Sequence, residues 1–275
     1  MVASDDIDLI LVTAGTGSDG AYARIHNWVM TSAKEPLVVV NIHQGPRKPS
    51  LGQEAFFNTV QVSMKEHLGT VPAFALGLGV ATKFATPGRL TLACAFHDDL
   101  DIKEESWDLI VRHAHAGQDN VLSGFFGGKG LGRDDIYSSP YDPYQLARQD
   151  CYSNMVDAEA HGMRSTKIET VAVLDGFSQI AEVHWLSRAF SKMAAAGIKH
   201  HAYDAYLGIL AAANGVTVKM LPVSCRHLGG QTAVLDQRYQ EWAAGKAPGG
   251  DAGLWLEAHR ITYEAGRGVL PVRVR

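Results

Sequence analysis

The sequence lacks several features that would place it in a membrane, secreted or metal-finger class. It has no apolar run close to the about 20 residues that a membrane-spanning helix needs. Its three cysteines, Cys94, Cys151 and Cys225, are too far apart for the paired spacing of a zinc site. Met1 to Ile7 include acidic but no basic side chains, unlike the start of a secretion signal. We therefore expect a globular cytoplasmic protein with free thiols.

Positive charge is also scarce. The 25 Lys and Arg residues are outnumbered by 29 Asp and Glu residues, which gives a net charge of −4, and the basic residues are scattered along the chain. A dedicated nucleic-acid-binding protein carries a basic patch or stripe, so the sequence excludes that class. An enzyme can still engage a nucleic-acid acceptor at a local contact face.

Short apolar runs alternate with segments of helical periodicity, which is typical of an α/β domain. The segment from Gly127 to Tyr144 lacks periodicity and is interpreted as a long loop over the active face. Its tyrosines fit either a sugar-stacking platform or packing of the loop itself. We expect strands at 8–13, 37–42, 89–96, 120–126, 169–174 and 216–222, and helices at 22–31, 54–68, 73–84, 104–116, 185–196 and 204–214; the tyrosines are Tyr137, Tyr141 and Tyr144.

Three carboxylates, Asp98, Asp99 and Asp101, directly follow the expected strand at 89–96. Carboxylates this close repel one another unless a cation or solvent offsets their charge. Mg²⁺ and Mn²⁺ prefer oxygen ligands, commonly one or two carboxylates together with substrate phosphates. Because parallel α/β sheets bind ligands outside the carboxyl ends of their strands, a metal and nucleotide site fits this position. The alternative is an acidic cap on the helix that begins near Glu104.

The aspartate cluster resembles the DxD motif of GT-A glycosyltransferases, particularly the inverting family 2 group, and three later segments follow in that family's order. Asp175-Gly176-Phe177 is similar to the loop that shapes the donor-sugar and acceptor region. Tyr203 to Tyr206 opens a helix where the family carries its catalytic acidic residue, and 216–227 resembles the closing strand with its metal-binding histidine. The resemblance spans about residues 6 to 230.

The resemblance implies one GT-A domain over residues 1–275, with a Rossmann-like mixed sheet flanked by helices. We expect its nucleotide-binding half to cover 6–101 and its acceptor half 102–230, and we expect a helical tail at 231–275, which the resemblance does not cover, to pack across the domain or mediate homo-oligomer association. The implied activity is transfer of a hexose or pentose from a nucleotide-diphosphate sugar, expected to be a UDP-sugar, to an acceptor hydroxyl with inversion. The implied cofactor is Mn²⁺ or Mg²⁺. The acceptor stays open among protein, glycan, small molecule and modified nucleic acid.

The resemblance also implies roles for single residues of the metal centre. Asp99 and Asp101 bind the metal, with Asp98-Asp99 as the alternative registration, and His227 completes the metal shell. Asp204 is the general base that takes the proton of the acceptor hydroxyl. Without the resemblance, Asp204 is interpreted as a helix N-terminal carboxylate and His227 as an ordinary loop histidine.

On the donor side, the resemblance implies that Thr13, Ala14 and Asn41 lie beside the nucleoside and that Asp98, Asp99 and Asp175 contact the nucleotide sugar. The family usually has an aspartate after its second strand to read the nucleoside. Here that place is held by Asn41, so the choice of nucleobase stays open.

A competing motif, Gly15 to Gly20, matches G-x-G-x-x-G directly after a strand and before a helix. That context is typical of an NAD(P)-dependent Rossmann oxidoreductase. Such an enzyme also needs an acidic residue about 20 positions onward for the ribose, where this chain has Asn41. The oxidoreductase is therefore the alternative hypothesis.

Overall fold

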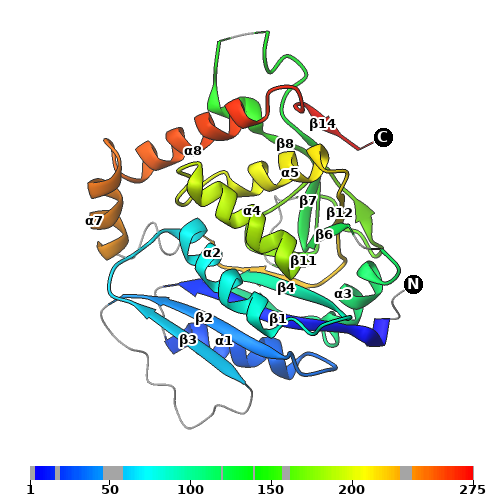
Figure 1. The fold of residues 1–275 in the computed structure, drawn as a ribbon. Coiled ribbons are helices and arrows are strands. Elements are labelled where there is room, and N and C mark those ends of the chain that lie inside the picture. The colour runs from blue at the N-terminus through cyan, green and yellow to red at the C-terminus, as the bar shows by residue number, and fades with distance from the viewer. Residues whose placement is uncertain are drawn as a thin grey trace.

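The computed structural model describes residues 4–15, 19–45, 58–118, 120–138, 140–156, 162–229 and 237–274. A central mixed sheet of eight strands runs in the order β3-β2-β1-β4-β11-β6-β12-β9 (Figure 1). Its strands are β1 (Ile7–Gly15), β2 (Val38–Gln44), β3 (Thr59–Met64), β4 (Leu90–His97), β6 (Val121–Gly124), β9 (Glu169–Thr170), β11 (Ser178–Glu182) and β12 (Thr217–Met220).

The four strands β3, β2, β1 and β4 are parallel, so their carboxyl ends lie along one edge of the sheet. β11 enters antiparallel between β4 and β6, and β12 is again parallel to β6. The residues that end β1 and β4 are thereby neighbours, and Ala14 pairs with His97.

Helices cover both faces of the sheet, because alternate residues of each buried strand point to opposite sides. In β1, Ile10 and Val12 pack with α2 (Thr70–Ala81), α4 (Val183–Ala195) and α5 (Tyr203–Ala213). Leu9 and Leu11 pack on the other face with α1 (Asp19–Met30) and α3 (Trp107–His115). This three-layer arrangement confirms the α/β class expected from the sequence.

Two smaller sheets and the C-terminal helices lie outside the central sheet. A second sheet has the order β10-β7-β14, with β8 paired to β7, and a two-stranded ladder joins β13 to β5. In Figure 1, α8 crosses above α5, and α7 extends from its end. The bounds are β5 (Leu100–Ile102), β7 (Phe126–Leu131), β8 (Arg148–Ser153), β10 (Val173–Leu174), β13 (Cys225–His227), β14 (Val272–Arg273), α7 (Gln237–Lys246), α8 (Asp251–Ala265), and the short 3₁₀ turns η1 (Ser4–Asp6), η2 (Thr82–Phe84) and η3 (Pro143–Leu146).

Two expectations about local structure are wrong. The described part of the expected helix at 54–68 contains β3, whose Val60, Val62 and Met64 alternate with polar residues and pack against the core as an edge strand. The glycine-rich segment expected as a loop contains β7 instead. A Cβ at Gly127 would lie 2.8 Å from the Val173 carbonyl oxygen, and one at Gly128 equally close to that of Gln149, so glycine allows the neighbouring strands to approach.

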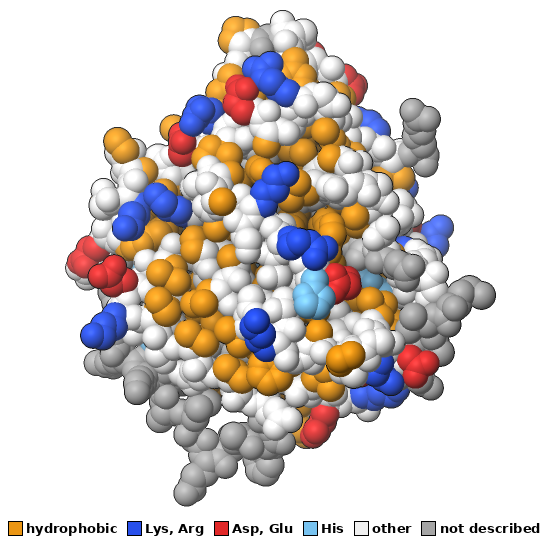
Figure 2. Space-filling view, in the orientation of Figure 1, with side chains coloured by type: hydrophobic (Ala, Val, Ile, Leu, Met, Phe, Trp, Pro, Cys, Tyr) orange, Lys and Arg blue, Asp and Glu red, His pale blue; other side chains and the backbone are white. Residues whose placement is uncertain are grey.

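In the described ranges, none of the helices combines the length and apolar character needed to cross a bilayer. On the face drawn in Figure 2, Lys, Arg, Asp and Glu side chains are scattered among apolar ones rather than gathered into a patch of one sign.

Candidate functional site

The site is built at the carboxyl end of β4, where the chain turns into β5. His97 ends β4, and Asp99 lies in the turn that follows. The antiparallel ladder between β5 and β13 pairs Leu100 with His227, and the Leu228 amide donates to the Asp99 carbonyl over 3.3 Å. Backbone pairing therefore brings a histidine from late in the sequence against the aspartate turn.

His97, Asp99 and His227 form a group whose ligand atoms all lie within 4.8 Å of one another. Asp99 Oδ1 is 3.1 Å from His227 Nε2 and 3.9 Å from His97 Nδ1. Asp99 Oδ1 and His227 Nε2 are buried without a hydrogen bond of good geometry. Two ligand atoms that each lie about 2.1 Å from one cation are at most about 4.2 Å apart, and both distances from Asp99 are within this limit, so the residues present fit a shared divalent ion.

The electrostatics of the group favour an ionised carboxylate at Asp99 and a neutral imidazole at His97, which are the protonation states that bind metals. Burial alone would raise the pKa of Asp99, but the close approach of His227 Nε2 and the neighbouring His97 ring lower it to about 2. Burial and the nearby His227 lower the pKa of His97 to about 4. Burial, followed by repulsion from Asp99, raises the pKa of Asp98 to about 7.

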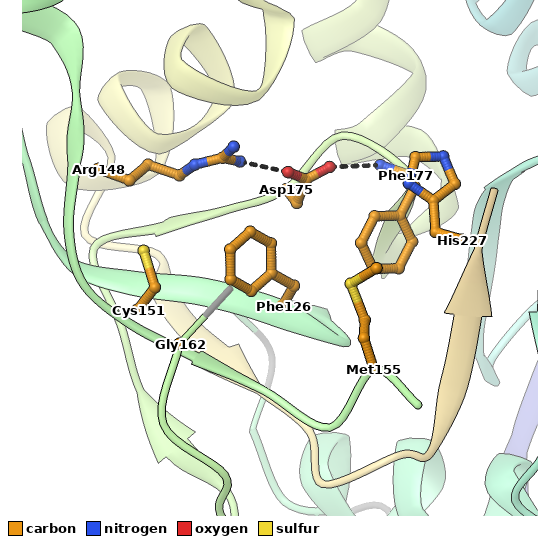
Figure 3. A pocket seen from close by; sticks show the side chains of 8 residues that line it. All are labelled: Phe126, Arg148, Cys151, Met155, Gly162, Asp175, Phe177 and His227. Carbon is orange, nitrogen blue, oxygen red and sulfur yellow. Dashed lines mark hydrogen bonds and ion pairs between the residues drawn. The ribbon is translucent and has the colours of Figure 1, made fainter. Parts of the chain in front are cut away.

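A cavity of about 370 Å³ opens beside this group and is drawn in Figure 3. Arg148, in the lining, forms ion pairs with Asp175, also in the lining, at 2.6 Å, and with Asp204 at 3.1 Å. The Arg148 guanidinium lies 5.1 Å from the centre of the Phe126 ring. The lining residues are Phe126, Arg148, Cys151, Met155, Gly162, Asp175, Phe177 and His227.

The pKa values of the two aspartates that share Arg148 are shifted in opposite directions. Burial alone would raise the pKa of Asp175. Arg148, His227 and His97 outweigh burial and hold this pKa below its ordinary value. For Asp204, burial dominates over the attraction of Arg148, and with repulsion from Asp175 it raises the pKa. Asp204 is therefore the stronger proton acceptor of the two.

The sequence matches no known protein family and no curated protein. The structure is similar to the crystal structure of GalNAc-T7 with UDP, GalNAc and Mn²⁺, with a TM-score of 0.58 and 11% sequence identity over 94% of this chain and 54% of that one. The chain thus spans about half the length of that protein. This fold is GT-A. The fold class expected from the sequence is confirmed, whereas an identity this low does not assign an activity.

Two other solved structures resemble the GT-A fold of this chain more weakly. Mannosyltransferase PcManGT from Pyrobaculum calidifontis, in complex with GDP-Man and Mn²⁺, gives a TM-score of 0.47 at 12% identity, over 95% of this chain and 70% of that one. The 4-diphosphocytidyl-2C-methyl-D-erythritol synthase of Anaerococcus prevotii DSM 20548 gives 0.46 at 11% identity, over 78% and 89%.

The structure brings together most, but not all, of the acidic residues singled out in the sequence. Asp99 and His227 meet at the metal-ligand group, and Asp175 and Asp204 meet through Arg148. Asp101 does not join them, because its carboxylate is bound by Lys103 Nζ at 2.5 Å and by the Asn27 amide at 3.1 Å. We expected Asp101 to be the second carboxylate ligand of the metal. In the structure the carboxylate of Asp101 lies outside the metal-ligand group.

The expected nucleoside contacts lie at the end of β1 and in β2. Ala14 is beside His97 and partly exposed. Thr13 is fully buried, and the Asn41 amide, on the face covered by α1, donates to the Tyr22 hydroxyl over 3.1 Å. Of the glycine motif, Thr16, Gly17 and Ser18 lie outside the described residues.

Two residues of the site were missed by the sequence reasoning. His97 stands directly before the aspartate cluster, and its position at a strand end was the signal that could have identified it. Arg148 lies in a stretch without a recognisable motif, and its role follows only from pairing of β8 with β7 beside α5. His97 is further held by a hydrogen bond between its Nε2 and the Tyr203 hydroxyl.

Proposed function

We propose that the protein is a metal-dependent glycosyltransferase that moves a sugar from a nucleotide-diphosphate sugar to an acceptor hydroxyl. The observation that carries this proposal is the convergence of His97, Asp99 and His227 at the carboxyl end of β4 in a GT-A fold. The solved structure with a similar fold is described with UDP, GalNAc and Mn²⁺, which supports a nucleotide-sugar donor.

His97, Asp99 and His227 are the residues that would hold Mn²⁺ or Mg²⁺. A divalent cation there supplies positive charge that stabilises the diphosphate as it leaves the sugar. Asp98 faces the same edge of the sheet, and its carboxylate packs directly against Gly15. We infer that Asp98, Asp99 and Ala14 line the diphosphate and nucleoside end of the donor site, with a UDP-sugar as the expected donor.

Asp204 is proposed as the general base for the acceptor hydroxyl. Its raised pKa makes it a better proton acceptor than Asp175, and Arg148 holds its carboxylate in place. Asp175 lines the cavity, and we infer that it accepts hydrogen bonds from sugar hydroxyls. We infer that the acceptor oxygen displaces the diphosphate in one step while Asp204 takes its proton, a displacement that inverts the anomeric centre.

The NAD(P)-dependent oxidoreductase is less well supported. A dinucleotide pyrophosphate must approach the glycine turn after β1 closely. Here the Asp98 carboxylate occupies the space beside Gly15, where a Cβ would lie 1.8 Å from Asp98 Oδ2. The Asp98 side chain therefore fills the space that a dinucleotide pyrophosphate would need directly against that turn.

The test is a calorimetric titration of the protein with UDP in the presence and absence of Mn²⁺. We expect binding that needs Mn²⁺ and that is lost in His227→Ala and in Asp99→Asn, while His184→Ala, an exposed histidine on α4, binds as the natural protein does. Asp204→Asn should keep UDP binding and lose transfer from a panel of nucleotide sugars. Binding of NADH but not of UDP with Mn²⁺ would contradict the proposal.

A further inference from the structure

The exposed Tyr144 of η3 and the half-buried Trp255 of α8 form an aromatic pair, here named the aromatic ledge. Their ring centroids are 5.5 Å apart with planes at 50°, and Tyr144 is 72% exposed. The neighbouring Tyr137 and Tyr141 contact Tyr263 at 4.9 and 4.8 Å, so these two rings pack the segment onto α8. Packing does not account for Tyr144, which covers little and faces solvent.

Hydrogen bonds at the start of η3 fix the backbone that carries the exposed Tyr144 ring. The Asp142 carboxylate accepts a hydrogen bond from the Tyr144 amide at 2.9 Å, and the Gln145 side chain accepts one from the Asp142 amide at 3.1 Å. This capping box, with Pro143 at the first position of η3, removes freedom from the turn. On the other side, Trp255 stacks on His259 with centroids 4.1 Å apart, and His259 Nδ1 donates to the Trp255 carbonyl. The ledge is therefore preorganised, which lowers the entropic cost of binding.

Each of the two ledge residues is followed, four residues later in the chain, by a residue that lies near Asp204. Four residues after Tyr144 the chain reaches Arg148, which lies 3.1 Å from the Asp204 carboxylate. One helical turn after Trp255 is His259, which is close enough to Asp204 for each to affect the ionisation of the other. The Thr262 hydroxyl, donating to the Ala202 carbonyl, anchors α8 at the start of α5. An acceptor with its hydroxyl at Asp204 can therefore extend over the ledge.

The surroundings of the ledge suit a neutral polyhydroxylated ligand. Tyrosine and tryptophan faces contact the apolar face of a pyranose ring while polar groups beside them bind its hydroxyls. Glu257 and Arg260 form an exposed ion pair on α8 near Tyr141, and Asp142 lies beside Tyr144. Lys199 also acts on Glu257, so these four groups carry two charges of each sign and offer phosphate-rich ligands no excess of positive charge.

We propose that the aromatic ledge binds a sugar ring of the acceptor, and that the acceptor is a glycan rather than a nucleic acid. This rests on the proposed glycosyl transfer and deepens it. Tyr144 and Trp255 bind a ring distant from the hydroxyl that reacts, so they set acceptor affinity and leave donor binding alone.

The test uses three neutral hexasaccharides, one each of glucose, mannose and N-acetylglucosamine. Their binding to the full chain without donor is measured by calorimetry and by tryptophan fluorescence. We expect one of them to bind, with about tenfold loss of affinity in Tyr144→Ala and in Trp255→Leu. Tyr144→Phe should retain binding, because it keeps the ring. Leu256→Ala, at a 50% exposed position on the same helix, is the matched control and should leave affinity unchanged.

A parallel titration with UDP and Mn²⁺ separates the two proposals. If UDP binds with Mn²⁺ but no hexasaccharide binds, or if Tyr144→Ala binds it as tightly as the natural chain, the ledge proposal is overturned and the transferase proposal stands. If the hexasaccharide binds through Tyr144 but UDP with Mn²⁺ does not, the ledge is a glycan site and the transferase proposal fails. Binding of an oligonucleotide or peptide through Tyr144 in place of a hexasaccharide would also overturn the glycan assignment.

Discussion

At the scale of single residues, the charge of the site depends on two carboxylates that pair with the same guanidinium. Arg148 lies between Asp175 and Asp204, and all three side chains are less than one third exposed. A lone guanidinium offsets two carboxylates there, so the cluster keeps a negative charge that suits hydroxyl groups and cations better than phosphate. Loss of Arg148 would therefore leave both carboxylates without their cation and should lower the stability of the fold.

We predict that Arg148→Met lowers the free energy of unfolding by about 2 kcal/mol, because it leaves two partly buried carboxylates without their counter-ion. Urea denaturation measures this effect. Arg133→Met, which breaks the exposed pair with Asp135, is the control and should cost less than about 0.5 kcal/mol.

The pH dependence of the Arg148→Met effect provides its own check. Without Arg148, the folded-state pKa values of Asp175 and Asp204 rise above their unfolded values, so the folded state binds protons more readily. The stability lost at about pH 8 should then shrink towards about pH 5, where protonation removes the repulsion. A deficit that is constant across this range would mean that packing, not charge, explains the change.

At the scale of elements, α2 is built from small residues so that it can lie close to the sheet. A Cβ at Gly77 would be 2.8 Å from Val12 Cγ1 and 3.0 Å from Ile42 Cγ1, both in the buried core. Two residues further along, a Cβ at Gly79 meets nothing within 4 Å. The helix thus holds β1 and β2, whose ends reach the site, at a fixed spacing.

We predict opposite effects from alanine at these two glycines of one helix. Gly77→Ala should destabilise the protein by about 1–3 kcal/mol through overpacking. Gly79→Ala should stabilise it by about 0.5–1 kcal/mol, because alanine has the higher helix propensity. Thermal unfolding of both variants checks this, and equal shifts of the same sign would show that α2 is not in tight contact with the sheet.

At the scale of the whole molecule, the C-terminal helices are docked through a small polar network. The Asp251 carboxylate, at the start of α8, accepts hydrogen bonds from the Tyr239 hydroxyl of α7 and from His201 Nε2 at 2.8 Å. The Trp242 and His67 rings, with centroids 4.6 Å apart, join α7 to the turn before α2. These contacts, with Thr262 on α8, fasten the tail across the helical face next to Asp204. Whether it also associates with a second copy stays a prediction.

Docking of the tail should weaken on acidification. Burial would raise the pKa of Asp251, but the hydrogen bonds from Tyr239 and His201 lower it below the ordinary value of 3.8. A folded-state pKa below the unfolded one gives stability that is present above the unfolded pKa and lost as pH falls through the folded one. Asp251→Asn should therefore lower the melting temperature at neutral pH, and the difference from the natural chain should disappear on acidification below about pH 4.

Hydrogen exchange locates the effect of Asp251→Asn. We expect faster exchange of α7 and α8 amides at neutral pH and unchanged exchange in β1 and β4. Glu264→Gln, in the same helix, breaks an exposed ion pair with Arg267 just beyond its end and should leave α7 protected. Uniformly faster exchange through the sheet would contradict local docking by Asp251.

The sequence by itself determined the elements whose signal is local. Uninterrupted apolar runs identified the parallel strands that became β1, β2 and β4, and acidic residues after the last of these marked the edge where the site lies. Edge strand β3 and glycine-rich β7 escaped this reasoning, because an edge strand is half polar and glycine carries no periodicity.

Only the tertiary structure decided which polar residues meet. Asp99 and Asp101 are equivalent carboxylates in sequence, but the β5–β13 ladder turns Asp99 towards His227, while Lys103 and Asn27 bind Asp101. Arg148 joins Asp175 to Asp204 across elements far apart in the chain, and no local pattern encodes that contact. Strand propensity acts over a few residues, whereas a metal-ligand group or a shared ion pair depends on backbone pairing between distant segments, which exists only once the sheet has formed.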